Sequence, residues 1–175
     1  DLTVTEVGVV VQFQRCILIL FEHVHGPHIV HLVQSFCRVV EIGAGQEISN
    51  FFFKAGGASG TIAKTLSAYD MKVSDSYYTP TKRYVSKDRL ENMLDFEYER
   101  LIYELSEKSN DKCFFALAST IEVLNFNRTN QGQGWMGLKY QLSSNSSPNI
   151  CVVHFLLHDD SVSSQQEVVG VIGVN

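Results

Sequence analysis

The stretch that decides the expected fold reads Phe51-Phe52-Phe53-Lys54, then Ala55-Gly56-Gly57-Ala58-Ser59-Gly60, then Thr61 to Met71. The apolar run at 51–54 is typical of a short strand, and the glycines after it indicate a tight loop. Beyond the loop, apolar residues recur at the spacing of one helix face, at Ile62, Ala63, Leu66 and Tyr69. The pattern predicts a strand, a glycine-rich loop and a helix in succession.

A loop of this kind is suited to binding an anion. Glycines let backbone N–H groups approach a ligand closely, and the N-terminus of a helix carries partial positive charge. The candidate ligand-binding residues in this stretch are Gly56, Gly57, Ser59, Gly60, Thr61 and Lys64. The stretch matches neither the Walker A pattern nor GxGxxG, and a tight turn without a ligand explains the glycines equally well.

A basic segment rich in tyrosine follows at residues 72–89. It holds five Lys or Arg residues and two Asp residues, and five minus two gives a net charge of +3 in a chain whose formal charge is -5. Lys82 and Arg83 are the candidate phosphate partners here, because basic side chains beside aromatic rings can bind a phosphate and stack on a base. The alternative is a solvated, charged surface loop.

The other expected elements surround this centre. Residues 3–21 predict one or two strands, and residues 29–40 predict a helix that Gly43-Ala44-Gly45 ends. A long amphipathic helix is expected near 88–108, with Ser86 and Asp88 as competing N-caps. Strands are expected at 112–118, 135–142 and 150–157, the last two joined by a turn at 143–148.

These elements predict an α/β or α+β fold, with a mixed sheet and flanking helices. Residues 51–175 are expected to form the α/β domain, whereas the segment 1–50 is left unplaced. The domain is expected to be part of a larger protein, because the chain begins without Met and stops directly after the apolar run 168–174.

Composition excludes several classes of protein. The chain has 175 residues, 45% of them hydrophobic, which is enough for a core without disulfides or metal. Its formal charge of -5 argues against a general nucleic-acid binder. The most apolar stretch, 7–21, is interrupted by polar residues and too short to span a bilayer, and no secretory signal is visible, so neither a transmembrane segment nor secretion is expected.

Cysteine and histidine placement bears on compartment and metal. Cys16, Cys37, Cys113 and Cys151 lie far apart, mostly in apolar runs, which favours reduced, buried thiols in an intracellular compartment, cytoplasmic or organellar. Four histidines crowd the stretch 23–31. A structural cluster explains them better than a metal site, since the chain is too short for the barrel that such hydrolases use.

The part from Phe53 to Asn175 resembles the C-terminal portion of a family of longer, uncharacterised bacterial proteins. These proteins carry inconsistent labels, chiefly nicotinate-nucleotide adenylyltransferase and TonB-dependent receptor. The resemblance implies a soluble α/β protein, a nucleotide ligand and a larger parent protein. The residues that carry it are Phe53 to Thr61, Ala63-Lys64-Thr65, Ser67 to Asp70, Arg83-Tyr84-Val85, Met93-Leu94-Asp95, Glu97-Tyr98, Gly134 to Gly137, Gln165-Gln166-Glu167, Gly170 and Ile172 to Asn175.

The function expected from these observations is the binding of a phosphate-bearing small molecule, with a nucleotide as the favoured case, at the glycine-rich turn. No catalytic residue, reaction or cofactor can be assigned. If the protein is a catalyst, phosphoryl or nucleotidyl transfer fits best, because that chemistry depends chiefly on positioning and charge stabilisation. The alternative is a non-catalytic accessory or scaffolding subunit of a larger assembly, whose protein partners would cover apolar surface.

Overall fold

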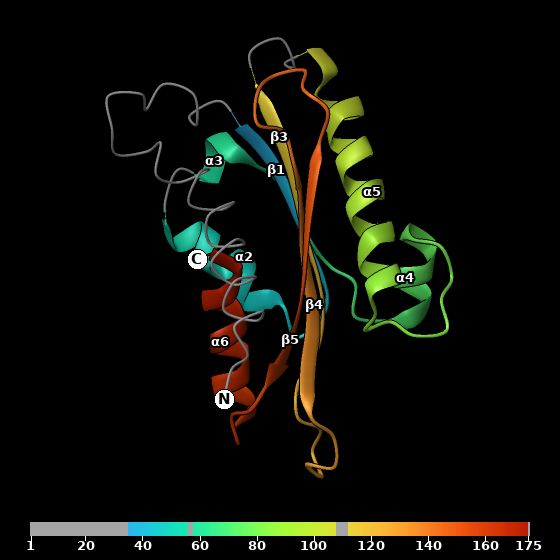
Figure 1. The fold of residues 1–175 in the computed structure, drawn as a ribbon, viewed down its shortest axis with the longest axis vertical. Helices are drawn as coiled ribbons and strands as arrows, with labels where there is room; N and C mark the ends of the chain where they lie inside the picture. Colours follow the sequence, from blue (N-terminus) through green and yellow to red (C-terminus); the bar gives the residue numbers. More distant parts are fainter. Residues whose placement is uncertain (1–34, 56–57, 108–111, 175) are drawn as a thin grey trace.

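The computed structural model describes residues 35–55, 58–107 and 112–174. These residues build one five-stranded sheet in the order β2-β1-β3-β4-β5 (Figure 1). The first three strands along the chain run parallel, and the last two pair antiparallel as hairpins. Their bounds are β1 Ser35–Gly43, β2 Ile62–Ser67, β3 Cys113–Glu122, β4 Gly132–Tyr140 and β5 Asn149–Leu157.

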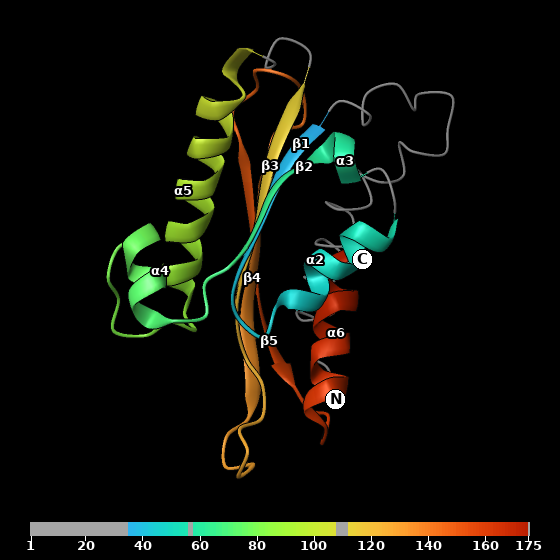
Figure 2. The same cartoon turned by 180° about the vertical axis from the view of Figure 1, so that it is seen from behind.

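Helices cover both faces of the sheet. Figures 1 and 2 show α2 (Gln46–Ala55) and α6 (Val162–Val174) together on one face, with α4 (Met71–Tyr77) and α5 (Lys87–Glu104) on the other. The short helix α3 (Ala58–Thr61) lies on the side of α2, at one end of the sheet. The expected fold class, a mixed sheet with flanking helices, is confirmed.

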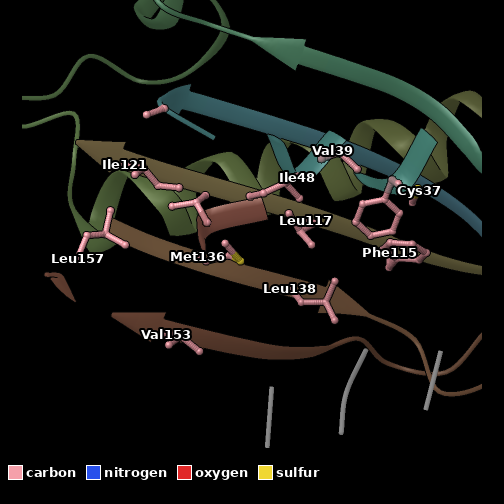
Figure 3. Packing of buried hydrophobic residues seen from close by; sticks show 13 residues of the cluster. Cys37, Val39, Ile48, Phe115, Leu117, Ile121, Met136, Leu138, Val153 and Leu157 are labelled. Carbon is pink, nitrogen blue, oxygen red and sulfur yellow. The ribbon is translucent and has the colours of Figure 1, made fainter. Parts of the chain in front are cut away.

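Two apolar clusters hold these layers together. Alternate residues of a strand point to opposite faces, so Cys37 and Val39 pack toward α2 and α6, whereas Val40 and Ile42 pack toward α5. Figure 3 shows the first cluster, to which Ile48 of α2 and side chains of β1, β3, β4 and β5 contribute. The central strands are therefore buried on both faces.

The second half of the chain agrees with the sequence prediction. The expected helix at 88–108 is α5, and Ser86 is its N-cap, because the Ser86 hydroxyl accepts a hydrogen bond of 3.3 Å from the Arg89 amide. The three expected strands are β3, β4 and β5, with the last two joined by the expected turn.

The first half departs from the prediction at three elements. The expected strand at 51–54 lies within helix α2, the expected helix at 61–71 contains strand β2, and residues 35–40 of the expected helix at 29–40 are strand β1. The remaining expected elements, at 3–21 and 29–34, lie outside the described residues. Part of the segment left unplaced by the sequence, β1, thus stands near the centre of the sheet.

These errors have physical causes. A parallel strand buried on both faces is a continuous apolar run, and such a run fits helical spacing as well as extended spacing. Strand β2 lies at an edge, where partly buried Ile62, Lys64 and Leu66 alternate with exposed residues. The strand pattern is hard to recognise in the sequence, because Ile62, Ala63 and Leu66 also fit the spacing of one helix face.

None of the helices among the described residues is long and apolar enough to cross a membrane.

Candidate functional site

The topology singles out the space between the carboxyl ends of β1 and β3. These strands are neighbours and parallel, but the chain leaves β1 toward β2 and leaves β3 toward β4. In open α/β sheets, a ligand crevice forms outside the carboxyl ends of the strands at such a switch point. Functional side chains are therefore expected at this switch point.

A row of polar residues crosses the sheet at this point. Glu41 of β1 pairs in register with Ser67 of β2 on one side and with Ser119 of β3 on the other. All three lie on the face covered by α2, since Val39 and Leu117, two residues earlier in β1 and β3, belong to the apolar cluster on that face. We call Ser67, Glu41 and Ser119 the polar row.

The turn between β1 and α2 packs directly against the polar row. Gly43 has a φ of 84°, a conformation that favours glycine, and a Cβ there would collide with the Ile121 carbonyl oxygen. A Cβ on Gly45 would lie 2.5 Å from the Ser119 Oγ and 3.6 Å from the Glu41 Oε2. The glycines thus bring the backbone at the start of α2 into contact with two polar side chains.

Both side chains are buried, and each has an oxygen without a hydrogen-bond partner among the described residues. Glu41 is 4% exposed and Ser119 is 0% exposed. Within the part of the chain that the structure describes, neither the Glu41 Oε2 nor the Ser119 Oγ has a hydrogen-bond partner. Unsatisfied buried oxygens are costly in folded proteins, and these two lie beside the same glycine at the switch point, which makes this place the candidate for a site that a ligand or water completes.

Burial also changes the acidity of Glu41. Desolvation raises the pKa of its carboxyl group to about 7, and the neighbouring Ser67 hydroxyl offsets part of this rise. A carboxyl group with this pKa exchanges its proton near neutral pH and can act as a general acid or base.

Gln46, the first residue of α2, closes the row toward its exposed end. Its Nε2 donates to the Gly43 carbonyl oxygen at 2.6 Å and to the Ser67 Oγ at 3.2 Å. Ser67 is exposed at the sheet edge, so the polar row leads from solvent to buried Ser119. The first amides of a helix have no α-helical acceptor, and in α2, which starts at this place, the Ile48 amide already donates to the Gly45 carbonyl oxygen at 3.1 Å.

The stretch on which the sequence prediction centred has a different structure. Gly56 and Gly57 lie outside the described residues, and Ser59, Gly60 and Thr61 form α3, a helix of four residues. The order is helix, loop, short helix and strand, so the expected long helix beginning at Thr61 is absent from this described stretch. The premise of a strand–loop–helix turn at 51–71 is wrong, and the ligand-binding role of these residues stays a prediction.

The three basic candidates lie on other elements. Lys64 projects from β2 to the α5 face, where its Nζ lies 3.4 Å from the Glu97 Oε1. Lys82 and Arg83 are exposed in the loop between α4 and α5. Figures 1 and 2 show that loop on the other face of the sheet from α3, so the structure does not bring Lys82 and Arg83 together with Ser59, Gly60 and Thr61.

Lys64 belongs to a buried ionic network centred on Glu97, which is 0% exposed. The Glu97 carboxylate accepts from the Arg38 Nη1 at 2.6 Å and from the Tyr78 hydroxyl at 2.9 Å, and Arg38 also pairs with Glu104. The network joins β1 and β2 to α5, and Glu97 has a partner on each of its carboxylate oxygens. It acts as a structural tie between layers.

The cysteines and histidines are the remaining candidates from the sequence. Cys37, Cys113 and Cys151 form no disulfide with one another, and burial raises the pKa of Cys37 to about 12. Among the described residues there is no group of three or more His, Cys, Asp or Glu side chains that could hold a metal ion. The histidine cluster at 23–31 and Cys16 lie outside those residues.

Sequence reasoning missed Glu41 and Ser119, although a signal was present. Glu41 is a lone acidic residue near the end of an apolar run, and Gly43-Ala44-Gly45 follows it at once. An apolar run that ends in an acid and a Gly-x-Gly turn is a strand–loop–helix pattern. It was overlooked because the run was assigned to a helix.

The fold defines an α/β domain with a three-stranded parallel half and an antiparallel hairpin extension. Its likeness is to solved structures of the competence-damaged protein (CinA) superfamily. No protein-family model and no curated protein match the chain.

Three solved structures illustrate this likeness. A CinA superfamily protein from Escherichia coli has a TM-score of 0.52 at 12% identity, and the match covers 99% of this chain and 90% of that one. The competence damage-inducible protein A (ComA) from Klebsiella pneumoniae has a TM-score of 0.54 at 10% identity, and the match covers 95% of this chain and 91% of that one. The competence/damage inducible protein CihA from Agrobacterium tumefaciens has a TM-score of 0.53 at 13% identity, and the match covers 94% of this chain and 92% of that one. At these identities the likeness shows the fold alone.

These matches overturn the resemblance drawn from the sequence. The structural neighbours are CinA superfamily proteins, whereas the resemblance pointed to proteins labelled nicotinate-nucleotide adenylyltransferase or TonB-dependent receptor. The resemblance was wrong because it was built on short, separate groups of residues, which can recur in unrelated chains.

Proposed function

We propose that this domain binds a phosphate-bearing small molecule, with the phosphate seated at the N-terminus of α2 above the polar row. The observation that carries the proposal is the pair of buried, unpartnered oxygens, Glu41 Oε2 and Ser119 Oγ, beneath Gly45. It supports a site whose hydrogen bonds a ligand completes.

The chemistry of the site favours an oxyanion. Amides at the start of a helix and the positive end of its dipole attract negative charge, and a hydroxyl group such as that of Ser119 donates to it. Gly43 and Gly45 keep the backbone open to close approach, as glycines do in other phosphate-binding turns. The expected function is thus kept, with its site at a strand–loop–helix turn one element earlier in the chain.

The test is a titration of the purified chain at pH 6 with inorganic phosphate, inorganic sulfate and a nucleoside monophosphate, followed by calorimetry. Saturable binding of all three, tightest for the nucleotide, is the expected result. If none of them binds, the proposal is wrong, and a non-catalytic scaffolding subunit becomes the favoured function.

Two glycine-to-alanine variants locate the site. We expect Gly45→Ala to weaken sulfate binding at least tenfold, because its Cβ would displace Ser119 Oγ and press on the Glu41 Cβ at 3.0 Å. Gly60→Ala is the matched control, since no atom of residues 35–55, 58–107 or 112–174 lies within 4 Å of the place a Cβ would take there. It is expected to bind sulfate as the unchanged chain does.

The same pair tests the earlier assignment to Gly56, Gly57, Ser59, Gly60 and Thr61. Loss of binding in Gly60→Ala with retention in Gly45→Ala would place the ligand at α3 and contradict the site at α2. Thermal unfolding of both variants checks that they fold, since overpacking at Gly45 is expected to cost about 1–3 kcal/mol.

A further inference from the structure

We propose that the oxyanion at the start of α2 is bound only together with a proton on Glu41, so that this site takes up one proton from solvent for each anion it binds. The inference rests on the proposed function and adds its protonation state. It concerns any phosphate or sulfate group that reaches the polar row.

The first argument is charge balance. An ionised Glu41 and a bound anion would place two negatively charged groups beside one helix N-terminus. The cations of β1 and β2, Arg38 and Lys64, cannot offset them, because both project to the opposite face and are paired with Glu97. In the described residues, Glu41 itself forms no ion pair.

The charged groups of the surrounding elements do not change this balance. On α2, Glu47 accepts from the Asn50 amide at 3.0 Å, and Lys54 lies in the last turn, over the Phe51 ring. The only charged residue of α6 is Glu167. Glu122 of β3 accepts from the Gln133 Nε2 at 2.6 Å, and as an even-numbered residue of that strand it faces away from the polar row. No cation of these elements is therefore placed to compensate an ionised Glu41.

The second argument is hydrogen bonding. An ionised carboxylate only accepts, so it would turn acceptor oxygens toward a sulfate or a fully ionised phosphate ester, which also only accepts. A protonated Glu41 donates one O–H to the anion, and the Ser119 hydroxyl can donate a second. Protonation thus converts the buried, unpartnered Oε2 from a repelling group into a partner for the ligand. The proton comes from water, and no covalent bond forms or breaks in the ligand.

Burial makes this proton available under ordinary conditions. Desolvation raises the pKa of Glu41 to about 7, so roughly nine-tenths of the carboxyl groups are protonated at pH 6 and one-tenth at pH 8. Binding to the protonated form alone therefore weakens about tenfold from pH 6 to pH 8.

Sulfate is the probe that isolates the effect, since its own charge is constant across this range. The experiment measures sulfate affinity by calorimetry at pH 6, 7 and 8 for the unchanged chain and for Glu41→Gln. The Gln side chain donates hydrogen bonds and does not titrate, so the variant is expected to bind with equal affinity at all three pH values. At pH 8 it should bind about tenfold more tightly than the unchanged chain.

Proton uptake gives a second readout that does not depend on a variant. At pH 8, the binding heat of the unchanged chain in two buffers of different ionisation enthalpy is expected to report close to one proton taken up for each sulfate. Sulfate binding that is independent of pH, without proton uptake, would overturn this inference and leave the proposed function standing. Absence of sulfate binding to both proteins at every pH would overturn this inference, and absence of phosphate and nucleotide binding as well would overturn the proposed function.

Discussion

Replacing Glu97 by leucine is expected to lower the free energy of unfolding by about 3–5 kcal/mol, because it removes one partner of a buried ion pair. Arg38 is 4% exposed and would keep only Glu104, while the Tyr78 hydroxyl and the Lys64 ammonium would lose their acceptor. Leucine fills a similar volume to glutamate. The loss in unfolding free energy therefore comes mainly from the unpaired charge of Arg38 and not from a cavity.

Urea unfolding of the unchanged chain and of three variants measures this effect. Glu104→Ala is the matched control: it breaks the other ion pair of Arg38, at a side chain that is 42% exposed, and is expected to cost less than about 1 kcal/mol. The double variant Arg38→Leu/Glu97→Leu is expected to recover part of the loss, since it leaves no unpaired charge at these positions. Equal effects of Glu97→Leu and Glu104→Ala would contradict a buried tie between α5 and the sheet.

Replacing Glu41 by glutamine is expected to stabilise the protein in alkaline solution and to flatten the dependence of its stability on pH. The pKa of Glu41 is raised to about 7 in the folded chain from an ordinary 4.5. The folded state therefore binds more protons than the unfolded state between these two values, and stability is lost as the pH rises through them. The full loss is about 3 kcal/mol, which is the pKa difference converted at 1.36 kcal/mol per unit.

The measurement is the difference in unfolding free energy between Glu41→Gln and the unchanged chain at pH 4 and at pH 8. We expect the variant to gain about 3 kcal/mol relative to the unchanged chain over this interval. Other carboxyl groups titrate in both proteins and cancel in the difference. A constant difference would mean that Glu41 titrates as an exposed acid, and the account of the polar row would fail.

The sequence predicted those parts of the fold whose pattern is local. Helix α5 carries an apolar stripe and a cap at Ser86, and β4 and β5 are joined by a turn that its own residues specify. Such signals need no knowledge of neighbouring elements. Strand β1 lacks them, because its apolar run comes from being covered by helices on both faces, a property of the finished fold.

The candidate site was missed for the same reason. Its residues come from three strands and one turn, and Ser119 is separated from Glu41 by 78 positions (119 minus 41) but pairs with it in register. Only the strand order brings them together. The sequence did predict the kind of turn that forms the site, a strand, a glycine loop and a helix, but placed it at 51–71, where helix α2, α3 and strand β2 lie.

The most direct test of the site at α2 is a titration of the isotopically labelled chain with sulfate at pH 6, followed by the amide resonances in a ¹H–¹⁵N correlation spectrum. The account predicts that the largest shifts occur at the amides of Gly45, Gln46 and Glu47, where the helix begins. Shifts confined to residues 56–61 and Lys64, or the absence of any saturable shift, would contradict it.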